Sequence, residues 1–136
     1  MINHGKLCPS HRLSKGASLI GIKNKEGKFD MLPEPIKVDQ TLYHEFQSHA
    51  TKPEKVLRFT NKCVQSGCKQ WTGTKCGVIE TVLEKVEQQY IEDSLPNCSI
   101  RNTCRWYDQR GGEACKVCSL VTTYVDDPKD DKYIKH

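Results

Sequence analysis

The feature that most constrains this chain is its eight cysteines, which stand in a sequence with little apolar mass. Seven of them lie between residues 63 and 118, and the eighth is Cys8. Only 36% of the 136 residues are hydrophobic, which is little for a core that must stabilise a fold by burial alone. An even number of cysteines in such a chain predicts a fold held together by disulfides or by bound metal.

The first sixteen residues, MINHGKLCPSHRLSKG, help to decide between these two. They contain no apolar stretch of signal-peptide length, and no later stretch reaches the ~18 apolar residues of a membrane span. We therefore expect a cytoplasmic protein without a membrane partner. Thiols that meet in a reducing cytosol more often hold metal or carry out redox chemistry than form structural disulfides, so metal is the first hypothesis. A disulfide scaffold is the alternative if a signal peptide has been removed.

Apolar residues in the first half of the chain predict β-structure. Residues 17–32 have the pattern of a β-hairpin around the turn NKEGK, and Pro33 and Pro35 are expected to stop its second strand. A short helix is predicted after Asp39, and a further strand over residues 55–60. The polar residues before the hairpin are expected to be irregular, with a turn at CPSH.

The second half predicts helices. Residues 76–93 form the clearest amphipathic helix, since apolar residues recur every three or four positions and Pro96 follows. A shorter helix is expected after Asn102, broken at Gly111, with a turn at EACKVC. We therefore expect a small, irregular, metal-stabilised α+β domain with an N-terminal β-hairpin and a central amphipathic helix.

The predicted organisation is a single cysteine-rich domain followed by a tail. The domain covers residues 1–125, with a β part over about 1–60 and a metal-binding part over about 61–125. The last residues, 126–136, are mostly charged and are expected to form a flexible tail.

The spacing of the thiols favours an iron–sulfur cluster over zinc. The two patterns are C-x4-C-x7-C and C-x5-C-x10-C-x2-C. Structural zinc sites are usually built from paired C-x2-C motifs, and only Cys115 and Cys118 form one. A cluster is larger than a single ion, so its thiolates can come from distant loops with uneven spacing, although neither ferredoxin pattern is present here. We predict one or two clusters of the 4Fe–4S type and keep zinc as the alternative cofactor.

All eight cysteines are predicted metal ligands, and they divide into two sets of four. We call Cys8, Cys63, Cys68 and Cys76 the N-terminal group, and Cys98, Cys104, Cys115 and Cys118 the C-terminal group. Cys8 completes its set only by arithmetic, and His11, three residues further on, is a rival donor. The sequence leaves this choice open, together with a free thiol at Cys8.

Cationic and aromatic residues stand among these cysteines. Four thiolates on a doubly charged centre leave about two negative charges, which Arg101 and Arg105 would compensate. Trp71 and Trp106 would exclude water from a cluster, and these four residues are therefore predicted to contact the cofactor. The alternative is ordinary core packing for the two rings and solvent exposure for the two arginines.

The stretches CVQSGCKQWTGTKCGV and LPNCSIRNTCRWYDQRGGEACKVCSLVTT carry a resemblance to a known group of proteins. They resemble small bacterial proteins, largely of unassigned function, whose seven or eight cysteines imply iron–sulfur binding. The resemblance covers about residues 55–125 and rests on the cysteine spacing, Trp71 and the CRWY neighbours. It implies a cluster-binding protein and points to no substrate.

These observations predict an iron–sulfur protein that transfers electrons, senses redox state or assists a partner, with another protein as its redox partner. The sequence has no Gly-rich phosphate loop, HExxH or GxSxG motif, so a stand-alone enzyme is not favoured and catalytic activity stays open. The alternative is a zinc-stabilised module that binds protein or nucleic acid, although a net charge of +4 is mild for a nucleic-acid binder. A thiol redox role for Cys115 and Cys118 comes third, since no thioredoxin-like βαβ pattern surrounds them.

Overall fold

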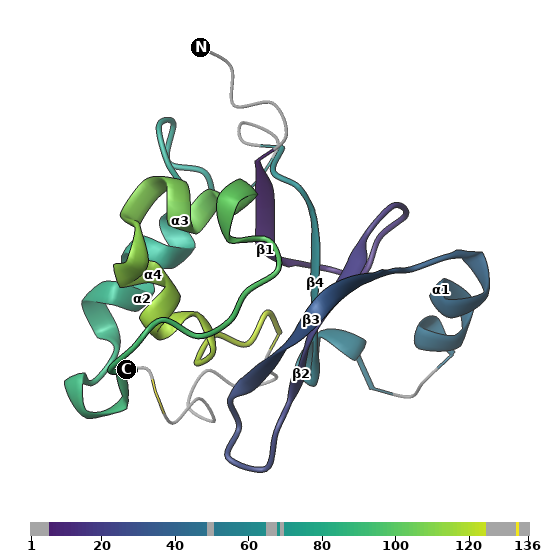
Figure 1. Cartoon of the computed structure of the whole chain (residues 1–136). Coiled ribbons are helices and arrows are strands. Elements are labelled where there is room, and N and C mark those ends of the chain that lie inside the picture. The colour runs from purple at the N-terminus through teal and green to yellow at the C-terminus, as the bar shows by residue number, and fades with distance from the viewer. Residues whose placement is uncertain (1–5, 49–50, 65–67, 69, 125–132, 134–136) are drawn as a thin grey trace.

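Four antiparallel strands form the centre of the computed structural model, which describes residues 6–48, 51–64, 68, 70–124 and 133. The strands are β1 (Leu7–His11), β2 (Ser18–Lys23), β3 (Phe29–Lys37) and β4 (Leu57–Lys62), in the order β1-β4-β2-β3. Helix α1 (Gln40–Gln47) lies on one side of the sheet, and α2 (Gly77–Lys85), α3 (Arg105–Arg110) and α4 (Gly112–Cys118) gather on the other (Figure 1). The α+β class expected from the sequence is confirmed.

The predicted β-hairpin is present as β2 and β3, which pair antiparallel. Its turn is built on Asn24, whose side-chain oxygen accepts two backbone N–H groups, at 2.9 and 3.1 Å. The prediction that Pro33 and Pro35 stop the second strand is wrong, because β3 runs through both. β3 is an edge strand whose register shifts around the two prolines, so neither has to donate a ladder hydrogen bond.

Strand β1 corrects the expectation of an irregular N-terminal segment with a turn at CPSH. This segment instead forms an edge strand that pairs with β4, with Cys8 opposite Asn61. Pro9 is tolerated there because an edge strand leaves some N–H positions unpaired. The strand predicted over residues 55–60 is confirmed as β4.

Three of the shorter elements can be compared with their predictions. Asp39 begins α1 as expected, since its carboxylate accepts the N–H of the third residue along at 2.9 Å. The helix expected after Asn102 begins later, after Cys104, because Arg101–Thr103 form a separate 3-10 turn. It ends at Gly111, φ 65°, as predicted. The segment EACKVC, expected as a turn, belongs to helix α4.

The central amphipathic helix is α2, which buries Ile79 and Val82. It is shorter than the predicted range, 76–93, because the backbone of Val86 is extended, with ψ 140°. Val86 is only 7% exposed in this extended conformation. The chain changes direction there, and Tyr90 lies in a separate 3-10 turn. Packing in the core therefore ends the helix earlier than the apolar pattern predicts.

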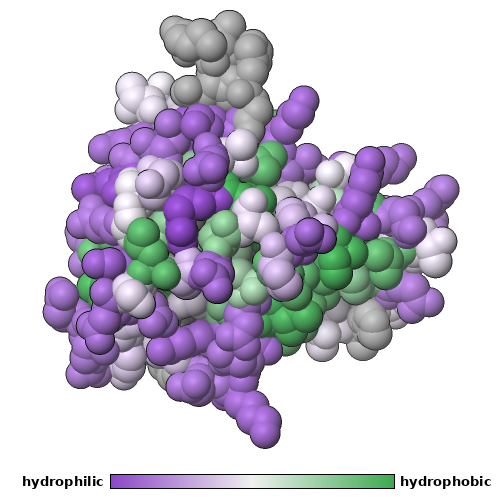
Figure 2. All heavy atoms as spheres, in the orientation of Figure 1, coloured by the Kyte–Doolittle hydropathy of each residue, from purple (hydrophilic) through white to green (hydrophobic). Residues whose placement is uncertain are grey.

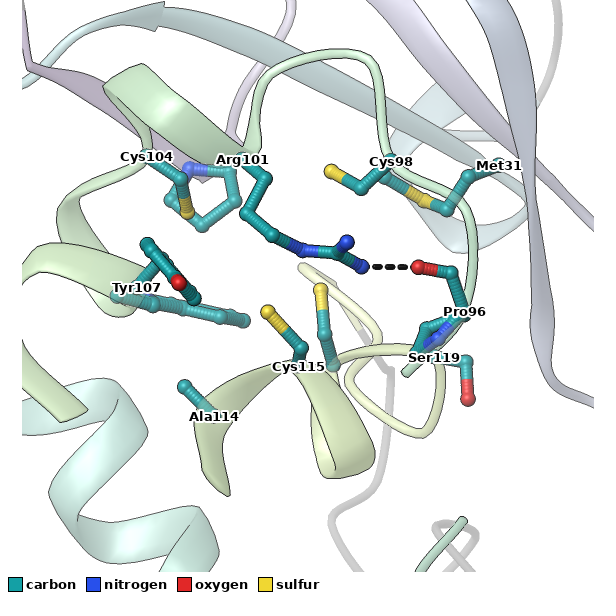
Figure 3. Close-up of a pocket in the computed structure, with 12 residues that line it drawn as sticks. Met31, Pro96, Cys98, Arg101, Cys104, Tyr107, Ala114, Cys115 and Ser119 are labelled. Atoms are coloured by element: carbon teal, nitrogen blue, oxygen red, sulfur yellow. Dashed lines mark hydrogen bonds between the residues drawn. The ribbon is translucent and has the colours of Figure 1, made fainter. Parts of the chain in front are cut away.

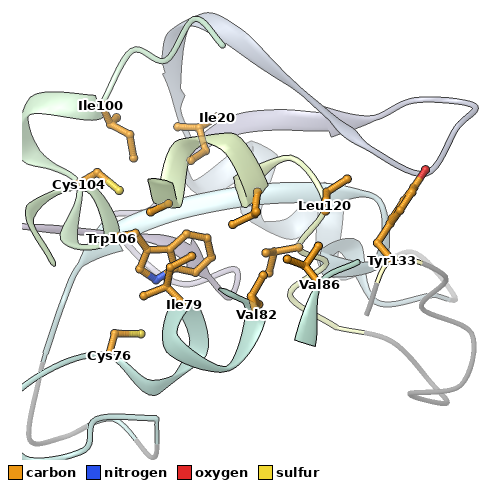
Figure 4. Packing of buried hydrophobic residues seen from close by; sticks show 13 residues of the cluster. Ile20, Cys76, Ile79, Val82, Val86, Ile100, Cys104, Trp106, Leu120 and Tyr133 are labelled. Carbon is orange, nitrogen blue, oxygen red and sulfur yellow. The ribbon is translucent and has the colours of Figure 1, made fainter. Parts of the chain in front are cut away.

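Buried side chains form two clusters, one on each face of the sheet. Leu19 and Phe59 pack toward α1, whereas their neighbours Ile20 and Arg58 face the other helices, as alternation along a strand requires. The larger cluster packs α2, α3 and α4 around Trp106 (Figure 4).

Most of the predicted tail, residues 126–136, lies outside the described residues. Tyr133 is described, and its side chain is only 5% exposed. Its ring packs edge-to-face on Tyr90, with ring centroids 4.8 Å apart, and its hydroxyl donates to the carbonyl of Glu26.

The surface in Figure 2 is mainly polar, with apolar atoms gathered over β3 and α1. Ile36, on β3, is 48% exposed. Among the described residues, no helix is both long enough and apolar enough to cross a membrane.

Candidate metal centre

The C-terminal group lines a single pocket between the sheet and the helices. Cys98 lies in the loop before α3, Cys104 directly precedes α3, and Cys115 and Cys118 lie on α4. Figure 3 shows the sulfurs of Cys98, Cys104 and Cys115 pointing into the pocket. Apolar side chains complete the walls, among them Pro9 of β1. The free volume is about 20 Å³, which is room for about one water molecule.

The guanidinium of Arg101 fills much of the space between these sulfurs (Figure 3). It donates to the carbonyl of Pro96, and the interaction with the neighbouring Cys115 side chain raises the pKa of Arg101. Its Nε has no hydrogen-bond partner in the described part of the chain. Arg101 therefore lies among the thiols, as the sequence predicted, and a bound group larger than water requires it to move aside.

A second arginine, Arg58 of strand β4, extends from the sheet toward the same group. It is fully buried, and its Nη1 donates to the Cys118 sulfur at 2.9 Å. Its Nη2 donates to the Cys118 carbonyl at 2.7 Å and also to the carbonyl of Val121. Its guanidinium carbon lies 4.7 Å from the ring centroid of Phe29 and 6.0 Å from that of Trp106. No carboxylate of the described residues forms an ion pair with it.

Backbone amides also act on the thiols of the C-terminal group. The amide of Ile100 favours a lower pKa of Cys98, and the amides of Tyr107 and Trp106 at the start of α3 favour a lower pKa of Cys104. Burial is nevertheless the largest effect, and it raises the pKa of the Cys98 thiol and that of the Cys104 thiol, the latter to about 12. A metal must therefore displace protons from these thiols before they can bind it.

The N-terminal group meets beside strand β1. Cys8 lies on β1, Cys63 follows β4 and donates its N–H to the carbonyl of Lys6 at 3.0 Å, and Cys76 precedes α2. Burial raises the pKa of Cys8 to about 12, and the thiolate charges of Cys76, Cys63 and Cys68 act in the same direction. The other three cysteines of this set thus lie near enough to Cys8 for their charges to act on it.

His11, the rival donor to this set, lies further along the strand. It stands three positions after Cys8, and the register of β1 shifts between the two residues. Its Nδ1 lies 2.8 Å from the Arg12 carbonyl oxygen and 3.3 Å from the Ser14 hydroxyl. The His11 ring is thus engaged with residues next to it in the sequence.

Gln109 of α3 holds the backbone of Cys76 in place. Its Oε1 accepts the Cys76 N–H at 2.8 Å, and its Nε2 donates to the Cys76 carbonyl at 2.9 Å. The same Nε2 lies 3.0 Å from a carboxylate oxygen of Glu80. A residue of the C-terminal half thereby positions a thiol of the N-terminal group.

Trp71 and Arg105 stand next to this group. The backbone of Trp71 forms an antiparallel bridge with Cys76, and the Arg105 guanidinium lies 5.3 Å from the centroid of the Trp71 ring. Arg105 is 4% exposed and 3.8 Å from a carboxylate oxygen of Asp108, while its Nε and Nη2 lack hydrogen-bond partners within the described residues. Trp106, 2% exposed, lines the pocket of the C-terminal group instead.

The C-terminal group has the donor chemistry of a thiolate-bound cluster, but its side chains do not have the geometry of a metal site in this structure. All eight cysteines lie in the described part of the chain and are free thiols. Four of them surround one pocket with guanidinium groups, amide donors and apolar walls, which are the features that hold and tune iron–sulfur clusters. Within the described residues, no group of three or more His, Cys, Asp or Glu side chains is arranged to hold a metal ion.

Two residues of these sites were missed by sequence reasoning. The burial of Arg58 could have been predicted. It lies between Leu57 and Phe59 in a strand, so its side chain points to the other face of the sheet, and both faces of a covered sheet are buried. Gln109 gave no signal, since polar residues on a helix are ordinarily solvated and its contacts depend on how α3 packs against the chain before α2.

Comparison of the chain with protein-family models, with characterised proteins and with solved structures gives no match.

Proposed function

We propose that the C-terminal group binds an iron–sulfur cluster of the 4Fe–4S type and that the N-terminal group binds a second one. The observation that carries this proposal is the meeting of four thiols around one pocket with Arg58 buried against Cys118. A buried guanidinium without a carboxylate partner is costly unless nearby negative charge compensates it. Four metal-bound thiolates carry such charge, whereas four neutral thiols do not.

When bound, an iron–sulfur cluster supplies one-electron redox chemistry. The thiolates of the C-terminal group would hold it, and the amide of Ile100 and the guanidinium of Arg58 would donate to their sulfurs. Trp106 and Met31 would keep water away from it. Arg101 would leave the space between the sulfurs and stay close enough to offset the negative charge of the thiolates.

We propose electron transfer, redox sensing or service to a partner protein as the role of this site. Cys68 is exposed, which brings the N-terminal group to the surface that a redox partner would approach. We also propose the cytoplasm as the compartment, because eight free thiols persist in a reducing environment.

The test is metal and sulfide analysis of protein purified without oxygen. We expect a brown protein whose visible absorption is bleached by dithionite and which contains iron and acid-labile sulfide. Cys104→Ser and Cys118→Ser should each lose the iron of the C-terminal group and melt at a lower temperature, since metal binding contributes folding free energy.

A matched control is available next to Cys118. Ser119 is 7% exposed, and its hydroxyl has no hydrogen-bond partner among the described residues. Ser119→Ala should therefore keep its iron. Full iron retention in Cys104→Ser and Cys118→Ser would remove both from the ligand set, and colourless protein with stoichiometric zinc would establish the zinc-stabilised module instead.

A further inference from the structure

We propose that a groove between strand β3 and the segment 96–101 binds a small zwitterionic molecule. The carboxylate of the ligand lies at Arg101, and its ammonium group lies at Glu26 and Asp30. The ligand class is an ω-amino acid or short peptide whose two charges are separated by an apolar segment. This inference goes beyond the proposed function and requires no bound metal.

Two adjoining pockets form this groove. The first, about 380 Å³, contacts residues 29–31 of β3, and the second, about 530 Å³, contacts residues 31–33. Met31 and Asn97 line both pockets, one from the strand and the other from the facing segment. The pockets therefore follow each other along the strand as one groove, which we call the β3 groove. Each volume lies in the range of ~300–1,000 Å³ that is typical of small-molecule sites.

The second pocket is the cationic end of the β3 groove. Arg101 lines it, and no carboxylate of the described residues does. A guanidinium has five N–H donors, and that of Arg101 donates to the Pro96 carbonyl and interacts with Cys115. The side chains of Asn97 and Ser99, at the same end, are exposed and make no hydrogen bond within the described residues. These polar groups suit a carboxylate, whose two oxygens accept several hydrogen bonds.

The first pocket is the acidic end of the groove. Three carboxylates line it, those of Glu26, Asp30 and Glu92. Lys28 is the one cation that lines it in the described part of the chain, and it pairs with Glu92 at 3.8 Å. Glu26 and Asp30 form no ion pair with any described residue. Two carboxylates therefore remain for an ammonium group, which has three donors.

The strand wall between the two ends is apolar. Met31 lies where the pockets join, and Leu32 and Pro33 continue the wall toward the cationic end. Figure 3 shows Met31 beside Cys98 and Arg101 of the facing segment. The apolar segment of the ligand would cover this wall and remove it from water. A molecule with only one of the two charges leaves the opposite end of the groove unpaired, so the groove selects for both.

The test is isothermal titration calorimetry of the full, reduced chain with straight-chain ω-amino acids of increasing length. We expect saturable binding that is tightest for the length that spans the two ends. The unbranched carboxylic acid and the alkylamine of that length each lack one charge and should bind about tenfold more weakly or worse. Absence of saturable binding for every ω-amino acid, or equal binding of the singly charged molecules, would overturn the proposal.

Substitutions at exposed positions test each end separately without disturbing the core. Asn97→Asp places a negative charge at the cationic end, and Glu26→Gln removes one from the acidic end. Each should weaken binding of the best ω-amino acid about tenfold, whereas Glu45→Gln on α1, the matched control, should not. Affinities that stay unchanged in both Asn97→Asp and Glu26→Gln would show that the ligand binds elsewhere.

Alkylation of Cys98 gives a second measurement in the same groove. Cys98 lines the cationic end, so a saturating ω-amino acid should slow its reaction with iodoacetamide severalfold. Cys68 is exposed and does not line the groove, and its rate should stay the same. A Cys98 rate that is unchanged at saturation would exclude the β3 groove as the binding site.

Discussion

Arg58 carries a positive charge into a part of the protein where it is fully buried. Burial of a charge destabilises a fold unless opposite charge and hydrogen bonds compensate it. Three of its hydrogen bonds go to a sulfur and two carbonyls, and its Nε has no partner among the described residues. A negative charge on the Cys118 sulfur would offset the buried positive charge of Arg58. We therefore expect Arg58 to influence the net charge of the C-terminal group.

Replacement of Arg58 should therefore shift the reduction potential of a cluster bound, as proposed, at the C-terminal group. Arg58→Gln removes a positive charge beside the sulfurs and should lower the midpoint by about 60–130 mV, the one-electron equivalent of the ~1.5–3 kcal/mol of a charged hydrogen bond. Arg58→Lys keeps the charge and should lower it less. The measurement is a redox titration followed by visible absorption, with exposed Arg12→Gln as control. Equal midpoints in Arg58→Gln and the unmodified protein would contradict this role.

Burial of the thiols predicts a wide range of alkylation rates in the metal-free, reduced protein. The thiolate is the reactive form, so a pKa raised to about 12 keeps Cys8 and Cys104 protonated at pH 8. They should react with iodoacetamide about 100- to 1,000-fold more slowly than exposed Cys68 and speed up as the pH rises toward 12. Mass spectrometry of timed samples measures each rate, and urea-unfolded protein is the control. Equal rates at all positions in native buffer would show that the groups are not preformed.

The sequence indicated which thiols could group together, but not what surrounds them. Counting the thiols offered Cys8 as the fourth member of the N-terminal group and left His11 as the rival. In the structure, β1 pairs with the strand that leads to Cys63, and the charges of Cys63, Cys68 and Cys76 act on Cys8. Arg58 could not be assigned to Cys118 in the same way, since 60 residues separate them and only the packing of α4 on the sheet brings them together.

The side chain of Gln109 fixes helix α3 to the backbone of Cys76 in the N-terminal group. Gln109→Ala removes two hydrogen bonds to the backbone of Cys76 and one to Glu80. We expect the free energy of unfolding to fall by about 1–3 kcal/mol and iron to be lost from the N-terminal group first. Urea unfolding and iron analysis measure the two effects. Gln89→Ala, which loses only a 3.3 Å contact with Glu87, should leave both unchanged, and equal effects of the two substitutions would contradict the role of Gln109.

Helices α2 and α3 are also linked by an ion pair at the surface. Hydrogen bonds from Arg110 and Gln109 lower the pKa of Glu80 to about 2, with Arg110 the larger cause. The stability that this pair contributes is fully present above pH 4.5, the ordinary value, and is lost as the pH falls toward 2. Arg110→Gln should raise the pKa of Glu80 toward 4.5 in an NMR titration. A pKa that stays near 2 would show that Gln109 alone is responsible.

The elements were predictable where local signals agreed with the packing. The hairpin turn and the Asp39 cap are set by neighbouring residues, and both were predicted. The prolines of β3 and the early end of α2 depend on distant parts of the chain. An edge position tolerates Pro33 and Pro35, and the extended backbone of Val86 is fixed by burial in the core.

In the whole molecule, the two cysteine groups lie where the sheet meets helices α2, α3 and α4, on the side opposite α1. Each group ties together segments that are distant in the sequence, from Cys8 to Cys76 in one and from Cys98 to Cys118 in the other. Metal bound at both would close these loops, and its binding free energy would add to the folding free energy. In this way bound metal would compensate for a hydrophobic content of only 36%.

The proposal that thiolate-bound clusters stabilise the fold is tested most directly by the ratio of iron to acid-labile sulfide in anaerobically purified protein. Iron and sulfide should be present in equal amounts, about four of each per occupied group, and removal of the metal should lower the melting temperature. Protein that melts at the same temperature with and without metal, and holds no sulfide, would contradict the claim that thiolate-bound clusters stabilise this fold.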